Sequence, residues 1–210
     1  IAYTSAKVDV TLPKYQDYET ASGKRKFVDD MFIEGMLYAA LKFSEHPKAI
    51  VKNIDYSQAL KLQGIHCVFT ADDIPGDRKV GLILKDWPVM TGKGETTHYI
   101  GDVIAGVVAD TEEIARKATE LIRVEYEVLK PVTDVFEAIE GERVHPERPN
   151  LFETTYFNRG NVQEVFDNAE FISEGFYETQ RIEHAFLEKE AAIALPDDDG
   201  GLILYSQSQG

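Results

Sequence analysis

The residues with the clearest chemical potential are a histidine and a glutamate four positions apart, His184 and Glu188. In an extended segment they share one face, but successive same-face residues are roughly 6.6 Å apart, so the two side chains cannot jointly bind a metal ion. In a helix they would be neighbours, yet the sequence has no HExxH motif of a zinc hydrolase. Two interpretations stay open: a histidine bonded to backbone at a strand start, and a metal-independent acid–base site formed by Glu183, His184 and Glu188.

Two further segments resemble ligand-binding loops only superficially. Residues 91–96, Thr-Gly-Lys-Gly-Glu-Thr, lack the order of glycines and lysine that a phosphate-binding loop requires. The acidic run Asp197-Asp198-Asp199-Gly200 lacks the alternating ligands and the distant closing glutamate of a calcium loop. We therefore predict no phosphate or calcium site, and a hairpin turn at residues 197–200.

Composition excludes two classes of partner. The net charge of −15 and the absence of any basic cluster longer than Lys24-Arg25-Lys26 argue against nucleic-acid binding. No apolar run approaches the ~20 residues of a membrane helix, so we predict no membrane partner. The single cysteine, Cys67, lies in an apolar run and is predicted to be buried. It cannot form an internal disulfide, which is compatible with the cytoplasmic location that we predict.

The elements that position these residues are clearest at the centre of the chain. An apolar run at 103–109 predicts a buried strand, followed by an amphipathic helix and a strand at 122–126, in a βαβ unit. Asp110 and Glu113 are expected to bond the free amides of the first helical turn. The helix positions expected to face the core are Ile114, Ala115, Ala118, Leu121 and Ile122.

The flanking segments complete a mixed pattern. Strands are predicted at 36–44, at 49–55 and from Gly64, with a short helix near 57–62. Residues 75–80 and 85–94 are rich in Gly, Pro and charge and are predicted to be surface loops. Residues 131–158 contain three prolines and little apolar periodicity, and are predicted to be an interdomain connector.

Several of these segments, in this order, resemble the molybdenum hydroxylases, the xanthine dehydrogenase and aldehyde oxidase family. Gly35–Ser44, Ala49–Asp55, Gly64–Gly76 and the unit at 99–126 are similar to the α/β-hammerhead domain of that family. Gly160–Val162, Ala169–Gln180, His184–Glu188 and Ser206–Gly210 look like the start of its molybdopterin-binding domain. The resemblance implies an α+β fold: a hammerhead domain, a mixed sheet with a βαβ unit, followed by the first strands of the molybdopterin-binding domain.

This interpretation divides the chain into four parts. Residues 1–21 are predicted to be an N-terminal arm or linker, 22–130 the hammerhead domain, 131–159 a connector, and 160–210 the start of a truncated molybdopterin-binding domain. The strand at 201–206 lies at the very end of the sequence, and the chain opens on Ile1 without an initiating methionine. We therefore expect a fragment of a longer polypeptide.

The resemblance also implies which residues approach the cofactor. They are Gln180, His184, Gln207 and Gln209; a family glutamine that often lies two residues before the histidine is replaced here by Ile182. The family's loop of the type Gly-Gly-x-Phe-Gly-Gly-Lys and its distant catalytic glutamate do not occur in these 210 residues. No catalytic and no metal-ligating residue is therefore expected in the fragment.

The implied activity is the oxidation of a purine-like N-heterocycle, of the xanthine or hypoxanthine type, with oxygen derived from water. The molybdenum cofactor, molybdopterin, would serve the intact enzyme, and iron–sulfur and flavin groups would lie on other domains or subunits. The partners would be the remainder of the molybdenum-binding subunit and a small-molecule substrate. The fragment alone is expected to be an inactive scaffold that binds no cofactor. Alternatives are an aldehyde oxidoreductase, a carbon monoxide dehydrogenase-type large subunit and a non-catalytic binding module.

Overall fold

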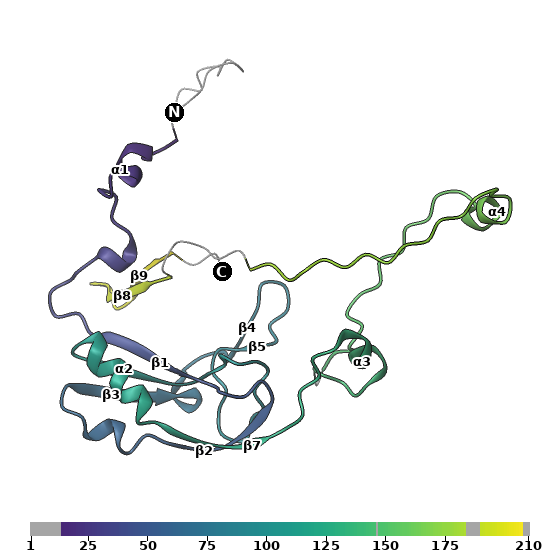
Figure 1. The fold of residues 1–210 in the computed structure, drawn as a ribbon. Coiled ribbons are helices and arrows are strands. Elements are labelled where there is room, and N and C mark those ends of the chain that lie inside the picture. Colours follow the sequence, from purple (N-terminus) through teal and green to yellow (C-terminus); the bar gives the residue numbers. More distant parts are fainter. Residues whose placement is uncertain (1–13, 146, 184–189, 208–210) are drawn as a thin grey trace. The chain divides into compact units, whose positions relative to one another are not determined.

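The computed structural model describes residues 14–145, 147–183 and 190–207 (Figure 1). The chain divides into two compact units, Leu37–Arg181 and the described residues of Ile1–Met36 with Ile182–Gly210. The larger unit contains β1 (Tyr38–Phe43), β2 (Ala49–Asp55), η2 (Ala59–Lys61), β3 (Ile65–Thr70), η3 (Ala71–Asp73), β4 (Lys79–Val80), β5 (Trp87–Pro88), β6 (Val103–Ala109), α2 (Glu112–Glu120), β7 (Arg123–Val128), α3 (Val135–Glu140) and α4 (Val162–Asp167). The smaller contains α1 (Asp17–Ala21), η1 (Val28–Asp30), β8 (Ala192–Pro196) and β9 (Leu202–Ser206).

The central strand of the larger unit is β6, which pairs antiparallel with β1 on one side and β3 on the other. Gly106 lies opposite Leu41 of β1 and Phe69 of β3. Ile104, Ala105 and Val107 are fully buried. A strand that is covered on both faces needs apolar side chains on both, which explains why its sequence is an apolar run without alternation.

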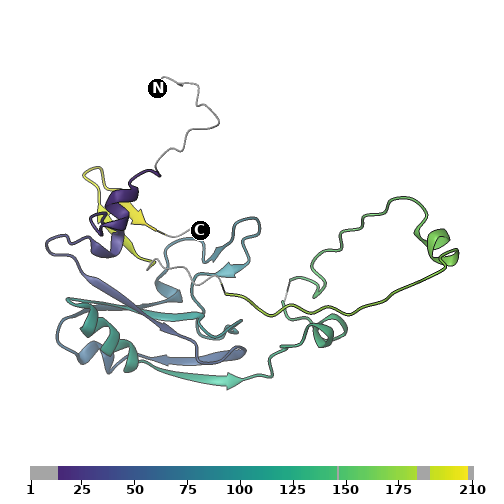
Figure 2. The same ribbon diagram turned by 45° about the horizontal axis from the view of Figure 1, so that its top comes forward.

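Helix α2 packs against β1 and β6 and covers one face of this sheet (Figures 1 and 2). The predicted core-facing positions are confirmed: Ala115, Ala118 and Ile122 are buried, and Ile114 and Leu121 are half-buried. One hydrophobic core cluster includes residues from η2, from β6 and from α2 and the residues after it. Its buried members are Ala59, Ala105, Val107, Ala118 and Ile122.

The predicted start of this helix is wrong by one residue. The N-cap is Thr111, whose hydroxyl accepts the Ile114 amide at 3.2 Å. Asp110 still belongs to the strand edge, because its amide donates to the carbonyl of Gly64 at 2.9 Å. Its carboxylate instead contacts His66, with Nε2 2.7 Å from Oδ1.

The predicted order of strand, helix and strand at 103–126 is confirmed, but the two strands lie in different sheets. β7 pairs antiparallel with β2, whereas β6 pairs with β1 and β3. The structure is a mixed α and β fold with small sheets, as the predicted class requires.

Two local predictions are wrong. Cys67 is exposed rather than buried. The register of β3 shifts between Ile65 and Cys67, and an extra residue at such a bulge changes the face to which the following side chain belongs. In the supposed surface loop at 85–94, Met90 and Thr91 are buried and Trp87–Pro88 forms β5 against β4.

In the smaller unit, β8 and β9 form the predicted hairpin. The turn between them contains Gly200 at φ 81°, and the Asp197 amide donates to the Gly201 carbonyl at 2.9 Å. The amide of Val28 donates to the side-chain oxygen of Gln207 at 3.2 Å, so the N-terminal segment is bonded to the end of the hairpin. Within the described ranges, no helix has the length and apolar character to cross a membrane.

The predicted connector, 131–158, contains only the short helix α3 among its described residues, and Asp134 caps that helix. Phe152, Tyr156 and Phe157 are exposed on it. Because exposed backbone with few buried contacts is the preferred substrate of proteases, we expect chymotrypsin to cut first after these aromatic residues. Mass spectrometry of the early fragments checks this expectation; first cuts between residues 99 and 126 would contradict the boundary.

Candidate functional site

The four residues predicted to approach a cofactor are only partly described. Gln180 is exposed on a segment without regular structure in the larger unit, and Gln207 is half-buried in the smaller one. The side-chain oxygen of Gln207 already accepts the Val28 amide. His184 and Gln209 lie outside the described residues.

Among residues 14–145, 147–183 and 190–207, no group of three or more His, Cys, Asp or Glu side chains could hold a metal ion. For the alternative acid–base site, Glu183 is exposed, while His184 and Glu188 fall outside the described ranges.

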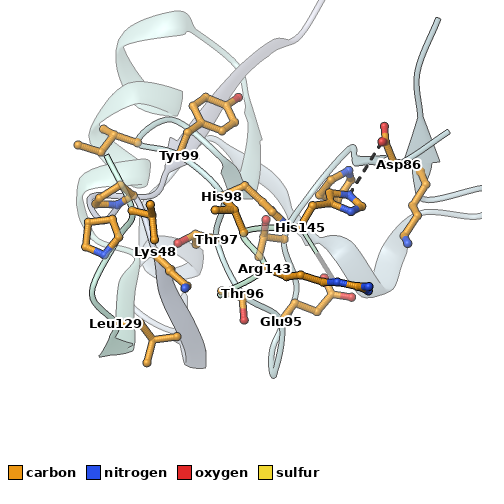
Figure 3. Close-up of a pocket in the computed structure, with 18 of the residues that line it drawn as sticks. Lys48, Asp86, Glu95, Thr96, Thr97, His98, Tyr99, Leu129, Arg143 and His145 are labelled. Carbon is orange, nitrogen blue, oxygen red and sulfur yellow. Dashed lines mark ion pairs between the residues drawn. The ribbon is translucent and has the colours of Figure 1, made fainter. Parts of the chain in front are cut away.

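The described part of the chain does contain a cavity, in the larger unit, that sequence patterns did not indicate (Figure 3). Residues 94–97 form one wall, because they run along the edge of β2. The Thr97 amide donates to Ala49 at 2.8 Å, the Gly94 amide to Val51 at 2.7 Å, and Val51 donates in return to Glu95 at 2.9 Å. The buried hydroxyl of Thr97 accepts the Ala49 amide at 2.9 Å. This segment thus acts as an additional strand on β2.

The next wall is the turn at 98–102. The carboxylate of Asp102 is buried and accepts the amides of His98 at 2.5 Å and Tyr99 at 3.4 Å. These bonds fix His98 and Tyr99 at the cavity. The ring of Tyr99 lies 5.3 Å, between centroids, from that of Trp87 in β5, which joins this wall to the β4–β5 hairpin.

Beside this turn, Arg78 and Glu95 form an ion pair with two hydrogen bonds. Arg78 donates from Nη1 and Nη2 to the two carboxylate oxygens of Glu95, at 3.0 and 2.7 Å, and Nη2 also donates to the Met90 carbonyl at 3.0 Å. Hydrogen bonding from Arg78 lowers the pKa of Glu95, the Gly92 amide lowers it further, and burial opposes both. The bond to Glu95 raises the pKa of Arg78.

We expect Glu95→Gln to make the free energy of unfolding depend less on pH in the acid range. A carboxyl whose pKa is lowered by folding contributes stability above its unfolded pKa, near the ordinary value of 4.5, and loses it as the pH falls through the folded pKa. Because Glu95 is 42% exposed, solvent screening limits the cost at neutral pH to about 1 kcal/mol. Urea midpoints between about pH 5 and 3 check this. Glu125→Gln, at an exposed residue with no ion pair in the described chain, is the control; identical acid slopes in both variants would contradict the assignment.

The third wall comes from the predicted connector, and ion pairs join this segment to the β4–β5 hairpin. Arg148 Nε lies 2.9 Å from Asp86 Oδ2, and His145 Nε2 lies 3.9 Å from the same oxygen. Lys79 and Glu147 are paired at 3.1 Å. Figure 3 shows Asp86 and His145 facing each other on this side. Nothing in local spacing indicates these contacts, since Asp86 and Arg148 are 62 residues apart.

In the loop at 91–96, the side chain of Glu95 binds the backbone of the loop itself. Glu95 Oε2 accepts the Gly92 amide at 2.7 Å, and the Glu95 amide donates to the Gly92 carbonyl at 3.1 Å. The Glu95 carboxylate thus takes the place that an anion bound to the Gly92 amide would need.

Comparisons with known proteins match both halves of the chain. The family model described as "Aldehyde oxidase and xanthine dehydrogenase, a/b hammerhead domain" matches residues 22–130, and that of the "Molybdopterin cofactor-binding domain" matches residues 144–210. A protein of Bacillus subtilis that is named as a probable xanthine dehydrogenase subunit is 35% identical over 190 residues, 90% of this chain and 25% of the relative.

Other relatives carry different names. The nicotinate dehydrogenase large molybdopterin subunit of Eubacterium barkeri is 29% identical over 198 residues, 93% of this chain and 46% of the relative. The solved structure of aldehyde oxidoreductase from Desulfovibrio gigas superposes with a TM-score of 0.83 at 27% identity, covering 93% of this chain and 23% of that one. The chain therefore spans less than half the length of each of these proteins.

Proposed function

Because the chain belongs to the aldehyde oxidase and xanthine dehydrogenase family, we propose that it is part of a larger molybdenum-binding polypeptide that oxidises a purine-like N-heterocycle. The observation that supports this most directly is that two family models match consecutively, at 22–130 and 144–210. In such an enzyme the molybdenum cofactor supplies the oxidation of the substrate and the activation of water.

The role that we propose for the described hammerhead residues is architectural. Two of their polar clusters are paired internally: Arg78 with Glu95, and Asp102 with the amides of its own turn. In the part of the chain that the structure describes, no cluster of candidate ligands could hold a metal. The domain would thus position the chain that leads to the cofactor, through Gln180 and, beyond the described residues, His184 and Gln209.

Partners are proposed on the same basis. The relatives from Bacillus subtilis and Eubacterium barkeri are named as subunits, and the second as a large molybdopterin subunit. Iron–sulfur and flavin domains or subunits would accept the electrons. A cytoplasmic location remains a prediction.

We propose the substrate class from the sequence identities to two relatives. The relative named for xanthine dehydrogenase shares 35% of aligned residues with this chain, against 27% for the aldehyde oxidoreductase. This difference favours a purine-like substrate. Aldehyde oxidation is the second candidate, favoured by the superposition with a TM-score of 0.83.

Steady-state kinetics of the longer polypeptide, purified with its electron-transfer partners, test the proposal. We expect kcat/KM for xanthine or hypoxanthine to exceed that for benzaldehyde. A preference for the aldehyde would overturn the substrate class, and a preparation that contains stoichiometric molybdenum but oxidises neither would overturn the activity.

Two variants in the same polypeptide test the predicted cofactor contacts. Gln180→Ala and His184→Ala should lower the molybdenum content and leave the denaturation midpoint unchanged. Loss of stability in His184→Ala with full molybdenum content would instead assign that histidine to the fold.

A further inference from the structure

The cavity of the larger unit has the size of a small-molecule site. Its volume is about 830 Å³, within the roughly 300–1,000 Å³ typical of ligand pockets. Its walls come from four parts of the chain: residues 47–48 before β2, residues 78–88 at the β4–β5 hairpin, residues 91–100, and residues 129–145. All four belong to one compact unit.

The cations on this cavity fall into two groups. Arg78 and Lys79 are each paired with a carboxylate, Glu95 and Glu147 respectively. Lys48 and Arg143 also line the cavity, and neither has a carboxylate partner within the described residues. Lys48 and Arg143 therefore give the cavity two positive charges that no ion pair within the described residues neutralises. They favour an anionic ligand.

The lining also contains apolar side chains, beside polar residues that include Asp86, Glu95 and His145. Ile100, Leu129 and Pro131 face the cavity. Thr91, also on its wall, is 1% exposed, and its hydroxyl has no hydrogen-bond partner among the described residues. Buried hydroxyls are usually satisfied, so this one points to a missing polar partner. A ligand with an apolar body and a polar end would match both features.

The polar end is better matched by a carboxylate than by a phosphate. Phosphate sites are commonly formed by free backbone amides, but the nearby amides are occupied: Gly92 donates to Glu95, Glu95 to Gly92, and Gly94 to Val51. A guanidinium such as that of Arg143 presents a planar pair of donors that fits a carboxylate.

We propose that this cavity binds a small organic carboxylate, with the carboxylate group held by Lys48 and Arg143 and the apolar body against Ile100, Leu129 and Pro131. None of the observations that support this site depends on the proposed oxidation reaction. Because Arg143 belongs to the connector and Lys48 to the β2 side, binding would also fasten the connector to the hammerhead domain.

Trp87 provides the readout, since it is the only tryptophan of the chain and its ring lies 5.3 Å from that of the cavity residue Tyr99. Titration of the 210-residue chain with benzoate should change its fluorescence saturably, with a Kd of about 1 mM or tighter. Benzyl alcohol, of similar shape but neutral, and inorganic phosphate, which lacks the apolar body, should each bind at least about tenfold more weakly.

Variants identify the residues. Lys48→Met and Arg143→Met should each weaken benzoate binding about tenfold, whereas Lys117→Met, at an exposed lysine of α2 that does not line the cavity, should leave it unchanged. Far-UV circular dichroism verifies that all three are folded. Benzoate should also slow chymotrypsin cleavage of the connector. No saturable change, equal binding of benzyl alcohol or phosphate, or unchanged affinity in both cavity variants would overturn the proposal.

Discussion

Val107→Asp is expected to unfold the hammerhead domain. Val107 is fully buried at the centre of β6 and belongs to the core cluster that joins sheet, η2 and α2. A carboxylate there has no polar partner and no access to water, so the substitution should cost several kcal/mol. Since single domains are stable by only about 5–15 kcal/mol, most of the margin would be lost. Urea midpoints measured by circular dichroism check this expectation.

The control places the same charge on an exposed strand position. Val128, at the end of β7, is 59% exposed, so Val128→Asp should change the free energy of unfolding by no more than about 0.5 kcal/mol. If Val107→Asp unfolds at the same urea concentration as Val128→Asp, the core has been placed wrongly.

Gly106→Ala should be the second most damaging change, although it adds only a methyl group. A Cβ built on Gly106 would lie 2.1 Å from Cζ of Phe69, its cross-strand neighbour. The ring would have to leave its place over the glycine, because β6 is held by strands on both sides. Overpacking of this kind costs about 1–3 kcal/mol. Gly76→Ala is the matched control, since its Cβ would meet no atom within 4 Å.

The cause of that loss can be tested with a double variant. If the clash is with the Phe69 ring, Phe69→Leu should destabilise the parent chain but cost less, or nothing, when Gly106→Ala is already present. The expected coupling energy is at least about 1 kcal/mol. Additive losses would show that Gly106→Ala acts through another contact.

What the sequence could predict depends on how local each signal is. The apolar run of β6 and the 3.6-residue spacing of α2 are repeated signals within one segment, so both elements and the buried face of the helix were correctly predicted. The N-cap was misassigned because Asp110 and Thr111 are both good capping residues, and a backbone bond from Asp110 to Gly64 decides between them. The exposure of Cys67 depends on a bulge, which shifts the register without leaving a mark in hydrophobicity.

The difference between local sequence signals and contacts made on folding also explains which site residues could be predicted. Gln180, His184, Gln207 and Gln209 were selected by family resemblance, and the described residues place only Gln180 and Gln207, in different units. The cavity was missed because its walls come from residues that meet only on folding, such as Lys48 and Arg143. Hydrophobic periodicity does not show that segments nearly one hundred positions apart line the same cavity. That Lys48 and Arg143 have no carboxylate partner within the described residues can be recognised only in the structure, where the ion pairs of Arg78 and Lys79 are seen.

We propose that these residues form a scaffold which alone does not hold the cofactor, and the molybdenum content of the 210-residue chain tests this proposal. The chain should be produced in a host that makes molybdopterin, and purified beside the longer polypeptide as a positive control. Elemental analysis is expected to find only background molybdenum in the 210-residue chain and a stoichiometric amount in the longer polypeptide. Stoichiometric molybdenum in the 210-residue chain would contradict the account.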